Sequence, residues 1–217
     1  MIDIVFPKDN EKKFIETAIK LDYKELIMAY SSEKDIKKIS SDKIKIYPAI
    51  LSKENDIMKN RKHGLVFVES IGKDRNILEK GCADILFNIE KNSGKDFMHQ
   101  RGSGMDHVMC KLAADKNIVI GFSFSDILGN EKNKAMVLGR IEQNIRLYHK
   151  FKVKYVIGSF AKKPMEMRSY RDLIDFFRLV GAEKNKIEEG YKELRRRVSK
   201  KDDNVIYEDK GIKIEKI

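Results

Sequence analysis

Cysteine and proline are scarce in this chain, which has two cysteines and three prolines among its 217 residues. Cys82 and Cys110 are too few for a disulfide framework and lack the spacing of a zinc site, which favours a reducing cytosol. With so little proline and no low-complexity linker, the sequence favours one folded domain over flexibly joined ones.

Long apolar segments are also missing. No hydrophobic run approaches the roughly 20 residues needed to span a bilayer. The first residues lack the basic start and the apolar core of a signal peptide. We therefore expect a cytoplasmic protein without membrane contact.

Residues that would build a catalytic centre are in short supply. The four histidines are His63, His99, His107 and His149, and they form neither an HxH nor an HExxH pair. A GxGxxG fingerprint, a P-loop and a serine-histidine motif are missing too. We predict no catalytic residue, no bound metal and no cofactor on this chain.

Positive charge is what the chain has in excess. Lys and Arg number 45 against 34 Asp and Glu, which gives a formal net charge of +11 and an isoelectric point of about 9.4. Because 41% of the residues are hydrophobic, the chain can bury a core and is not simply a disordered basic tail. A folded basic protein predicts a polyanionic partner, since each Lys or Arg set against a phosphate releases counterions.

Short apolar runs alternate with helical patterns along the chain. The runs that we interpret as buried strands are Ile2 to Phe6, Leu26 to Tyr30, Ile44 to Ile50, Leu65 to Glu69, Ile85 to Ile89, Ile118 to Ser123 and Tyr155 to Phe160. The periodic segments between most of them are Glu11 to Leu21, Ser52 to Lys62, Arg75 to Lys80, Gly104 to Lys116 and Glu131 to Phe151. About seven or eight such repeats predict an α/β, TIM-barrel-like (β/α) barrel of parallel strands. An open doubly wound sheet is the alternative.

Two further helices and a short hairpin are predicted after the seventh strand. Ser169 and Asp172 have the spacing of a capping box at the start of the first helix. The apolar faces of the two helices are formed by Tyr170, Leu173, Ile174 and Phe177, and by Ile187, Tyr191, Leu194 and Val198. Apolar runs around Asp209-Lys210-Gly211 predict a hairpin or an edge strand. We assign residues 1–201 to a single barrel domain and residues 202–217 to a C-terminal extension.

The most distinctive segment is residues 99–114, a basic elbow before an amphipathic helix. Ser103 and Asp106 have capping-box spacing, so the helix is expected to begin there. The residues that follow the i, i+3, i+4, i+7 rule, and that we expect on its buried face, are Met105, Val108, Met109 and Leu112.

This elbow has the composition of an anion site. Gly102 and Gly104 would let the backbone approach a ligand, and the amides of the first helical turn suit a phosphate. Arg101 would add a bidentate fork. The competing interpretation is an ordinary junction between loop and helix whose charges face water.

Polar residues also follow most of the predicted strands, and in a parallel barrel these positions meet at one rim. They are Glu69, Ser70, Glu90, His99, Arg101, Ser123, Ser125, Asp126, Ser159, Lys162, Lys163 and Arg168. Basic residues further decorate or follow the long helix: Lys132, Lys134, Arg140, Arg146, Lys150, Lys152 and Lys154. That helix face could bind phosphates, although a charged stripe is commonly only the solvated side of a helix.

The run from Arg101 to Ala114, with Ile118 to Ser123 beyond it, resembles the central motif of the archaeal and eukaryotic ribonuclease P protein component 3 family. Further segments fall in the order expected of that family: Gly64 to Ser70, Asp84 to Leu86 and Ser169 to Leu173. The resemblance covers most of residues 1–200. The residues beyond Lys201 lie outside it.

The resemblance implies a TIM-barrel-like protein subunit of the ribonucleoprotein that removes 5′ leaders from precursor tRNA. The RNA subunit would carry the chemistry, together with Mg²⁺. The implied partners are the ribonuclease P RNA, ribonuclease P protein component 2 and the other protein subunits. The motif makes Arg101, His107 and Lys111 candidate RNA-binding residues. Four further candidate RNA-binding residues are inferred from their predicted position at the rim of the barrel: His99, Lys162, Lys163 and Arg168.

Two other functions fit the same sequence. A free-standing TIM-barrel phosphoesterase could use Glu69 or Asp126 as an acid or base on a small phosphorylated substrate. A general RNA-binding chaperone would need only the diffuse basic surface. Hydrolysis by the purified protein would identify the first, and equal retention of unrelated RNAs would identify the second.

Overall fold

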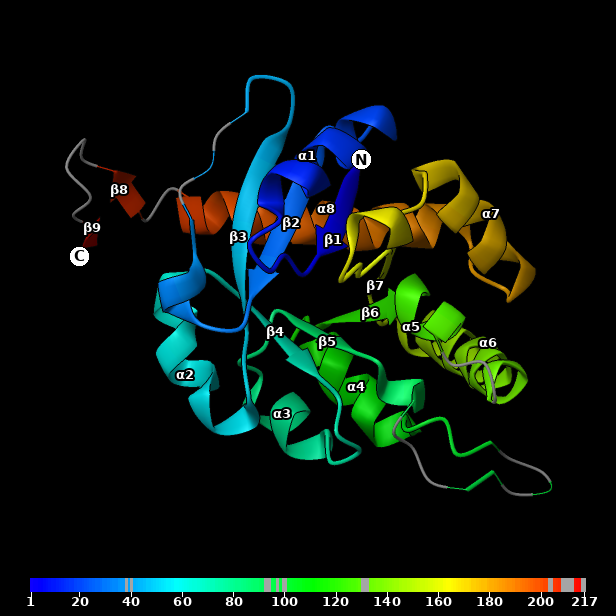
Figure 1. Cartoon of the computed structure of the whole chain (residues 1–217). Coiled ribbons are helices and arrows are strands. Elements are labelled where there is room, and N and C mark those ends of the chain that lie inside the picture. Colours follow the sequence, from blue (N-terminus) through cyan, green and yellow to red (C-terminus); the bar gives the residue numbers. More distant parts are fainter. Residues whose placement is uncertain are drawn as a thin grey trace.

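Seven parallel strands in sequential order form the centre of the molecule (Figure 1). The computed structural model describes residues 1–37, 39, 41–91, 95–96, 98, 101–129, 133–202, 205–207 and 213–215. The strands are β1 (Ile2–Val5), β2 (Glu25–Tyr30), β3 (Lys45–Leu51), β4 (Leu65–Glu69), β5 (Ile85–Phe87), β6 (Val119–Ser123) and β7 (Tyr155–Gly158). Each pairs in parallel with the next. The predicted TIM-barrel-like fold is confirmed, and all seven predicted strands are present.

Helices surround this barrel (Figure 1). They are α1 (Glu11–Lys20), α2 (Ile57–Asn60), α3 (Arg75–Lys80), α4 (His107–Asp115), α5 (Phe124–Gly129), α6 (Lys134–Phe151), α7 (Tyr170–Leu179) and α8 (Lys184–Asp202). Helix α5 was not predicted, and the predicted helix over Ser52 to Lys62 is a short α2 between two 3₁₀ turns. The Ser169 cap is confirmed, because its Oγ accepts from the backbone N–H of Asp172. No helix in the described part of the chain is long and apolar enough to cross a membrane.

The C-terminal residues form a separate two-stranded sheet. Strand β8 (Val205–Tyr207) pairs antiparallel with β9 (Lys213–Glu215). The predicted turn at 209–211 lies outside the described residues.

The barrel closes between its first and last strands through few contacts. Val5 and Ala161 form an isolated parallel bridge, next to which Phe6 N–H donates to the Ala161 carbonyl at 2.8 Å. The carboxylate of Asp3 accepts from Ser159 twice, from N–H at 2.7 Å and from Oγ–H at 2.6 Å. Complete burial raises the pKa of Asp3 to about 6, although these hydrogen bonds oppose the shift. The seam therefore contains a carboxyl group that is costly to ionise.

Replacing Asp3 with asparagine is expected to stabilise the protein at pH 8 and to have little effect at pH 4. The unfolded carboxyl ionises near pH 3.8 and the folded one near pH 6, so the wild-type free energy of unfolding falls as the pH rises through this window. The asparagine variant has no carboxyl group to ionise, so it avoids a loss of stability that reaches about 3 kcal/mol at pH values above 6. Urea unfolding of both proteins at the two pH values measures the difference. A stability difference that does not change with pH would contradict the prediction.

Helix α8 lies across the end of the barrel at which the strands begin (Figure 1). Arg195 Nε donates to Glu25 at the start of β2, and Arg197 Nη1 donates to Asp84 just before β5. Glu193 accepts from Lys154 Nζ just before β7. The predicted inward face of α8 is confirmed, since Ile187, Tyr191, Leu194 and Val198 are buried. Much of its positive charge is therefore used within the fold rather than left for a ligand.

Candidate functional site

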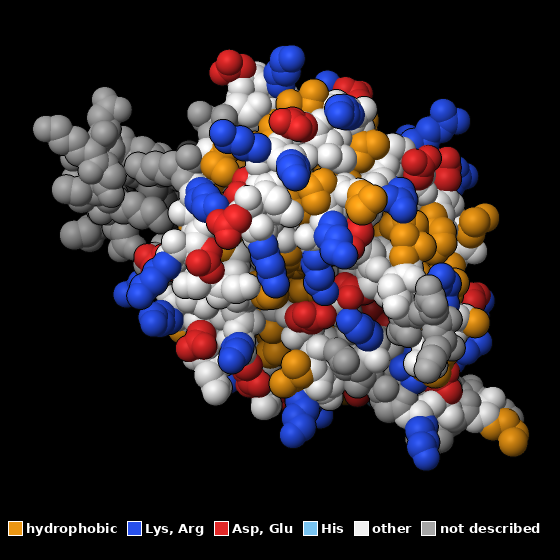
Figure 2. Space-filling view, in the orientation of Figure 1, with side chains coloured by type: hydrophobic (Ala, Val, Ile, Leu, Met, Phe, Trp, Pro, Cys, Tyr) orange, Lys and Arg blue, Asp and Glu red, His pale blue; other side chains and the backbone are white. Residues whose placement is uncertain are grey.

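The strands end at the opposite side of the barrel, where enzymes of this fold place their active sites. Asp126, on α5, accepts from Asn88 Nδ2 at 2.9 Å, from Ser123 Oγ at 2.7 Å and from Lys91 Nζ at 3.0 Å. Asn88 also donates to Glu69 at 2.8 Å. Acidic and basic side chains accordingly lie intermixed over this face (Figure 2). The mouth of the barrel is neutralised largely by its own side chains.

This arrangement is poorly suited to acid-base catalysis at Asp126. Burial opposes its ionisation, but the hydrogen bonds from Asn88, Ser123 and Lys91 outweigh burial and lower the pKa of the carboxyl. The cavity beside Asp126 measures about 10 Å³, and a single water needs roughly that much. A small phosphorylated substrate therefore does not fit in this cavity.

Aromatic rings fill the barrel near this end. Phe6, Phe87 and Phe160 lie at or just beyond the ends of β1, β5 and β7, and their ring centroids lie 5.0–6.1 Å apart. All three are buried. In the part of the chain that the structure describes, no group of three or more His, Cys, Asp and Glu side chains could hold a metal ion.

The elbow before α4 differs from its prediction in how the helix begins. Helix α4 starts at His107, and its N-cap is Asp106, whose Oδ1 accepts from the backbone N–H of Met109 at 2.8 Å. The prediction of a Ser103 cap was therefore wrong. Because a carboxylate already accepts from the first turn, it repels a phosphate that would bind at the same amides. The Asp106 carboxylate thus occupies the first turn, where the glycine-rich sequence indicated an anion site.

Ser103 and Gly104 serve the packing of the elbow instead. Ser103 is buried and accepts at Oγ from Gln143 Nε2 at 2.9 Å. Gly104 has φ +81°, and a Cβ there would lie 2.9 Å from the carbonyl oxygen of Ile89. Gly104 is therefore needed for close packing against the backbone of Ile89, whereas the sequence had indicated a close approach to a ligand. The buried residues of α4 are Cys110 and Ala113. Of the four residues predicted on the buried face, Met105 is buried just before the helix, whereas Val108, Met109 and Leu112 are only half-buried.

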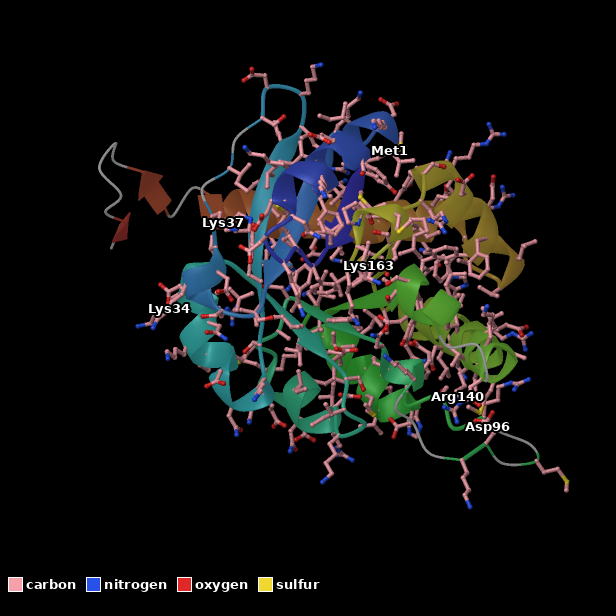
Figure 3. All side chains as sticks on the ribbon, viewed as in Figure 1. Met1, Lys34, Lys37, Asp96, Arg140 and Lys163 are labelled. Atoms are coloured by element: carbon pink, nitrogen blue, oxygen red, sulfur yellow. The ribbon has the colours of Figure 1, made fainter. Side chains whose placement is uncertain are left out.

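Arg140 fastens the elbow to α6 (Figure 3). Its side chain is 2% exposed, and it donates from Nε to Asp96 Oδ1 at 2.8 Å and from Nη1 to the Glu90 carbonyl at 3.0 Å. Asp96 also accepts from the backbone N–H of Gly102. Arg140 was predicted to decorate a phosphate-binding face, and this prediction was wrong, since the guanidinium is buried inside the protein.

Asn144, one helical turn further along α6, makes a second link. Its Nδ2 donates to Glu90 Oε1 at 3.1 Å and to the Ser103 carbonyl at 3.0 Å. Burial raises the pKa of Glu90 to about 7. Arg140 and Asn144 together hold the turn after β5 and the elbow on one helix.

A groove of about 410 Å³ lies on the solvent side of this junction, and we call it the α6 groove. It is lined by Arg101, Gly139, Glu142, Gln143, Arg146, Leu147 and Lys150. Arg101 reaches it from the elbow and is half exposed. The structure thus places Arg101, which the sequence motif predicted to bind RNA, in this groove.

The other predicted residues lie on separate elements. His107 and Lys111 are exposed on α4, and Lys162 and Lys163 are exposed on the loop after β7, where Lys163 lies over the barrel (Figure 3). Lys162 Nζ is 3.7 Å from Asp126 Oδ1. Arg168 donates to the carbonyls of Met165 and Met167, which holds that loop in place. His99 and Lys132 lie outside the described residues.

Sequence reasoning missed Gly139, Gln143 and Lys91. Gln143 accepts from Arg101 N–H at 3.1 Å and donates to the Arg101 carbonyl at 2.9 Å, which fixes the backbone that carries the arginine. A glycine in the middle of a long helical pattern is unfavourable in itself and was the one signal that could have indicated a close contact on α6.

The fold and the site define a TIM-barrel-like protein whose barrel mouth is filled by its own side chains and whose outer surface carries a basic groove. The family model described as RNase P subunit p30 matches residues 75–204 of this chain. This match takes in most of the chain, including the elbow, the α6 groove and α8, and the chain belongs to that family.

Individual relatives agree with this assignment. The chain is 35% identical over 80 residues to ribonuclease P protein component 3 of Archaeoglobus fulgidus, which covers 36% of this chain and 40% of the relative. It is 27% identical over 171 residues to the protein of the same name from Methanococcus vannielii, and this match covers 75% of this chain and 64% of the relative. The matches thus span less than two thirds of these relatives' length.

A solved structure shares the fold over its whole length. It is a chain in the cryo-EM structure of archaeal ribonuclease P with mature tRNA, with a TM-score of 0.73 at 23% sequence identity. The likeness covers 100% of this chain and 99% of that chain.

Proposed function

We propose that this chain is a protein subunit of ribonuclease P that supports the catalytic RNA in removing the 5′ leader from precursor tRNA. The RNA carries the chemistry with Mg²⁺, and the chain supplies a scaffold and positive charge. Its partners are the ribonuclease P RNA, ribonuclease P protein component 2 and the other protein subunits, in the cytoplasm. The observation that carries this proposal is the family match over residues 75–204.

The geometry of the chain is consistent with a supporting role. A phosphoesterase is not favoured, because the cavity at the barrel mouth is too small for a phosphorylated substrate and because the neighbours of Asp126 lower the pKa of its carboxyl. The accessible cations of the elbow and α4 instead face outward. Arg101, His107 and Lys111 would contact phosphates, which position an RNA without reading its sequence. Recognition of RNA shape therefore dominates over contacts to bases.

Reconstitution of precursor-tRNA cleavage from the RNA and the partner proteins, with and without this chain, tests the proposal. Omitting the chain is expected to lower the cleavage rate, and Arg101→Ala to lower it about tenfold at limiting chain, the effect of one charge-assisted hydrogen bond. The control is Arg178→Ala, which removes an exposed arginine from the end of α7. Equal rates with and without the chain would contradict the proposed function.

A further inference from the structure

We propose that the α6 groove binds the sugar-phosphate backbone of an RNA helix, and that Gly139 is glycine because the guanidinium of Arg101 occupies the space of its side chain. A Cβ on Gly139 would lie 2.6 Å from Arg101 Nε and 2.8 Å from Nη1. The proposal rests on the proposed function only in taking RNA as the ligand.

The lining residues of the groove form one continuous stripe. Along α6 the positions 139, 142, 143, 146, 147 and 150 recur at three- and four-residue intervals, so they share one face of the helix. From Gly139 to Lys150 this face is about 16 Å long at the usual rise per residue. Arg101 lies over the Gly139 end of the groove, and Lys150 lies at the opposite end. The distance between them is long enough for more than one phosphate of an RNA strand.

Positive charge dominates the groove. Arg101, Arg146 and Lys150 contribute three cations, against one carboxylate from Glu142, which pairs with Arg146. The Arg146 side chain is 77% exposed and that of Arg101 49% exposed, so both guanidinium groups are accessible to a ligand. Asp96, 3.6 Å from Arg101 Nη1, is already bound by Arg140 and by the backbone of Gly102.

The Arg101 end of the groove is organised in advance. Gln143 hydrogen-bonds both the N–H and the carbonyl of Arg101, and Gly139 lets the guanidinium lie against the helix backbone. Less conformational freedom is then lost when the side chain engages a phosphate. A planar guanidinium held in this way presents the fork geometry that suits phosphate oxygens.

A protein partner fits the groove less well. Protein interfaces have an apolar core that is depleted of charged residues. Leu147 is the one aliphatic side chain among the lining residues, and cations stand at both ends and beside it. The arrangement is that of a backbone contact to nucleic acid, in which charge supplies most of the affinity.

The double variant Arg146→Gln/Lys150→Gln tests the groove with a fluorescein-labelled RNA hairpin, whose affinity for the full-length protein is measured at several salt concentrations. The matched control is Arg178→Gln/Lys184→Gln, which removes the same two residue types from exposed, ion-paired positions elsewhere. We expect the groove variant to bind about tenfold more weakly, with a salt slope reduced by about 1 to 2. The control is expected to change affinity by less than about threefold.

Gly139→Ala provides a second variant without any change of charge. The added methyl group displaces only the far end of Arg101, so we expect weaker binding of the hairpin, by about threefold to tenfold, and a thermal midpoint that is unchanged or raised. Such a loss of affinity in a fully stable protein is not the result of misfolding.

The outcomes separate the groove from the proposed function. Equal affinities of the groove variant and its control, or no binding of the hairpin by the wild type, would overturn the groove proposal. So would loss of component 2 binding with unchanged RNA affinity. A chain that binds the hairpin through the groove but adds nothing to precursor-tRNA cleavage would leave the groove proposal standing and contradict the proposed function.

Discussion

Arg140→Ala is expected to lower the free energy of unfolding by about 3 kcal/mol, the lower end of the effect of breaking a buried ion pair, because Asp96 is 23% exposed. Arg140 is 2% exposed and donates to Asp96 and to the Glu90 carbonyl. Alanine leaves the carboxylate of Asp96 without its main partner and opens a cavity between α6 and the elbow. Urea unfolding followed by circular dichroism measures the loss.

The control for this prediction is Arg146→Ala, on the same helix and 77% exposed. A surface ion pair of this kind contributes under about 1 kcal/mol. Hydrogen exchange adds a local test, because backbone N–H groups of the elbow such as Gly102, which donates to Asp96, should exchange faster in Arg140→Ala. Similar stability losses at positions 140 and 146 would show that the buried pair does not hold the elbow.

Gly190→Ala is expected to cost about 3 kcal/mol, at the upper end of the range for overpacking a core. A Cβ on Gly190 would lie 2.7 Å from the carbonyl carbon of Tyr155 and closer still to its oxygen, and backbone atoms at the start of β7 cannot easily move aside. Helix α8 must then shift, which weakens the hydrogen bond from Tyr191 Oη to the Ile157 carbonyl and the Arg197 contacts. The thermal midpoint should fall by about 10 °C.

Gly139→Ala is the matched control, because both glycines lie inside helices. Alanine in a helix interior is otherwise favourable by about 1 kcal/mol, and at position 139 the new methyl group meets only the end of a flexible arginine. The two substitutions should therefore change stability in opposite directions. A stable Gly190→Ala protein would show that α8 does not need its close approach to β7.

The barrel could be predicted because its strands are contiguous apolar runs. A strand such as Leu65–Glu69 is buried on both faces, between the barrel interior and the helices, and so it has almost no polar position. The hydrophobic pattern thus determined strand identity and order with no knowledge of long-range contacts. Strand ends were less certain, as at β5, where Ile89 leaves the strand for a 3₁₀ turn.

The elbow could not be predicted in detail because two caps compete within it. Ser103 and Asp106 are both residue types that cap helices, and the local sequence does not choose between them. The side chains of Gln143 and Asn144, about 40 residues away, hydrogen-bond to Ser103 and hold it inside the fold. Asp106 is then the residue that caps the helix.

The sequence by itself determined that this protein is a basic TIM-barrel-like member of its family, because hydrophobic periodicity, net charge and the elbow motif are local or additive properties. Only the tertiary structure decided which arginines of α6 are accessible. Arg140 and Arg146 look alike in sequence, but one faces Asp96 across a buried junction and the other lines the α6 groove beside the guanidinium of Arg101. That difference depends on where the elbow crosses the helix, and side-chain burial against a distant segment is not encoded in any local pattern.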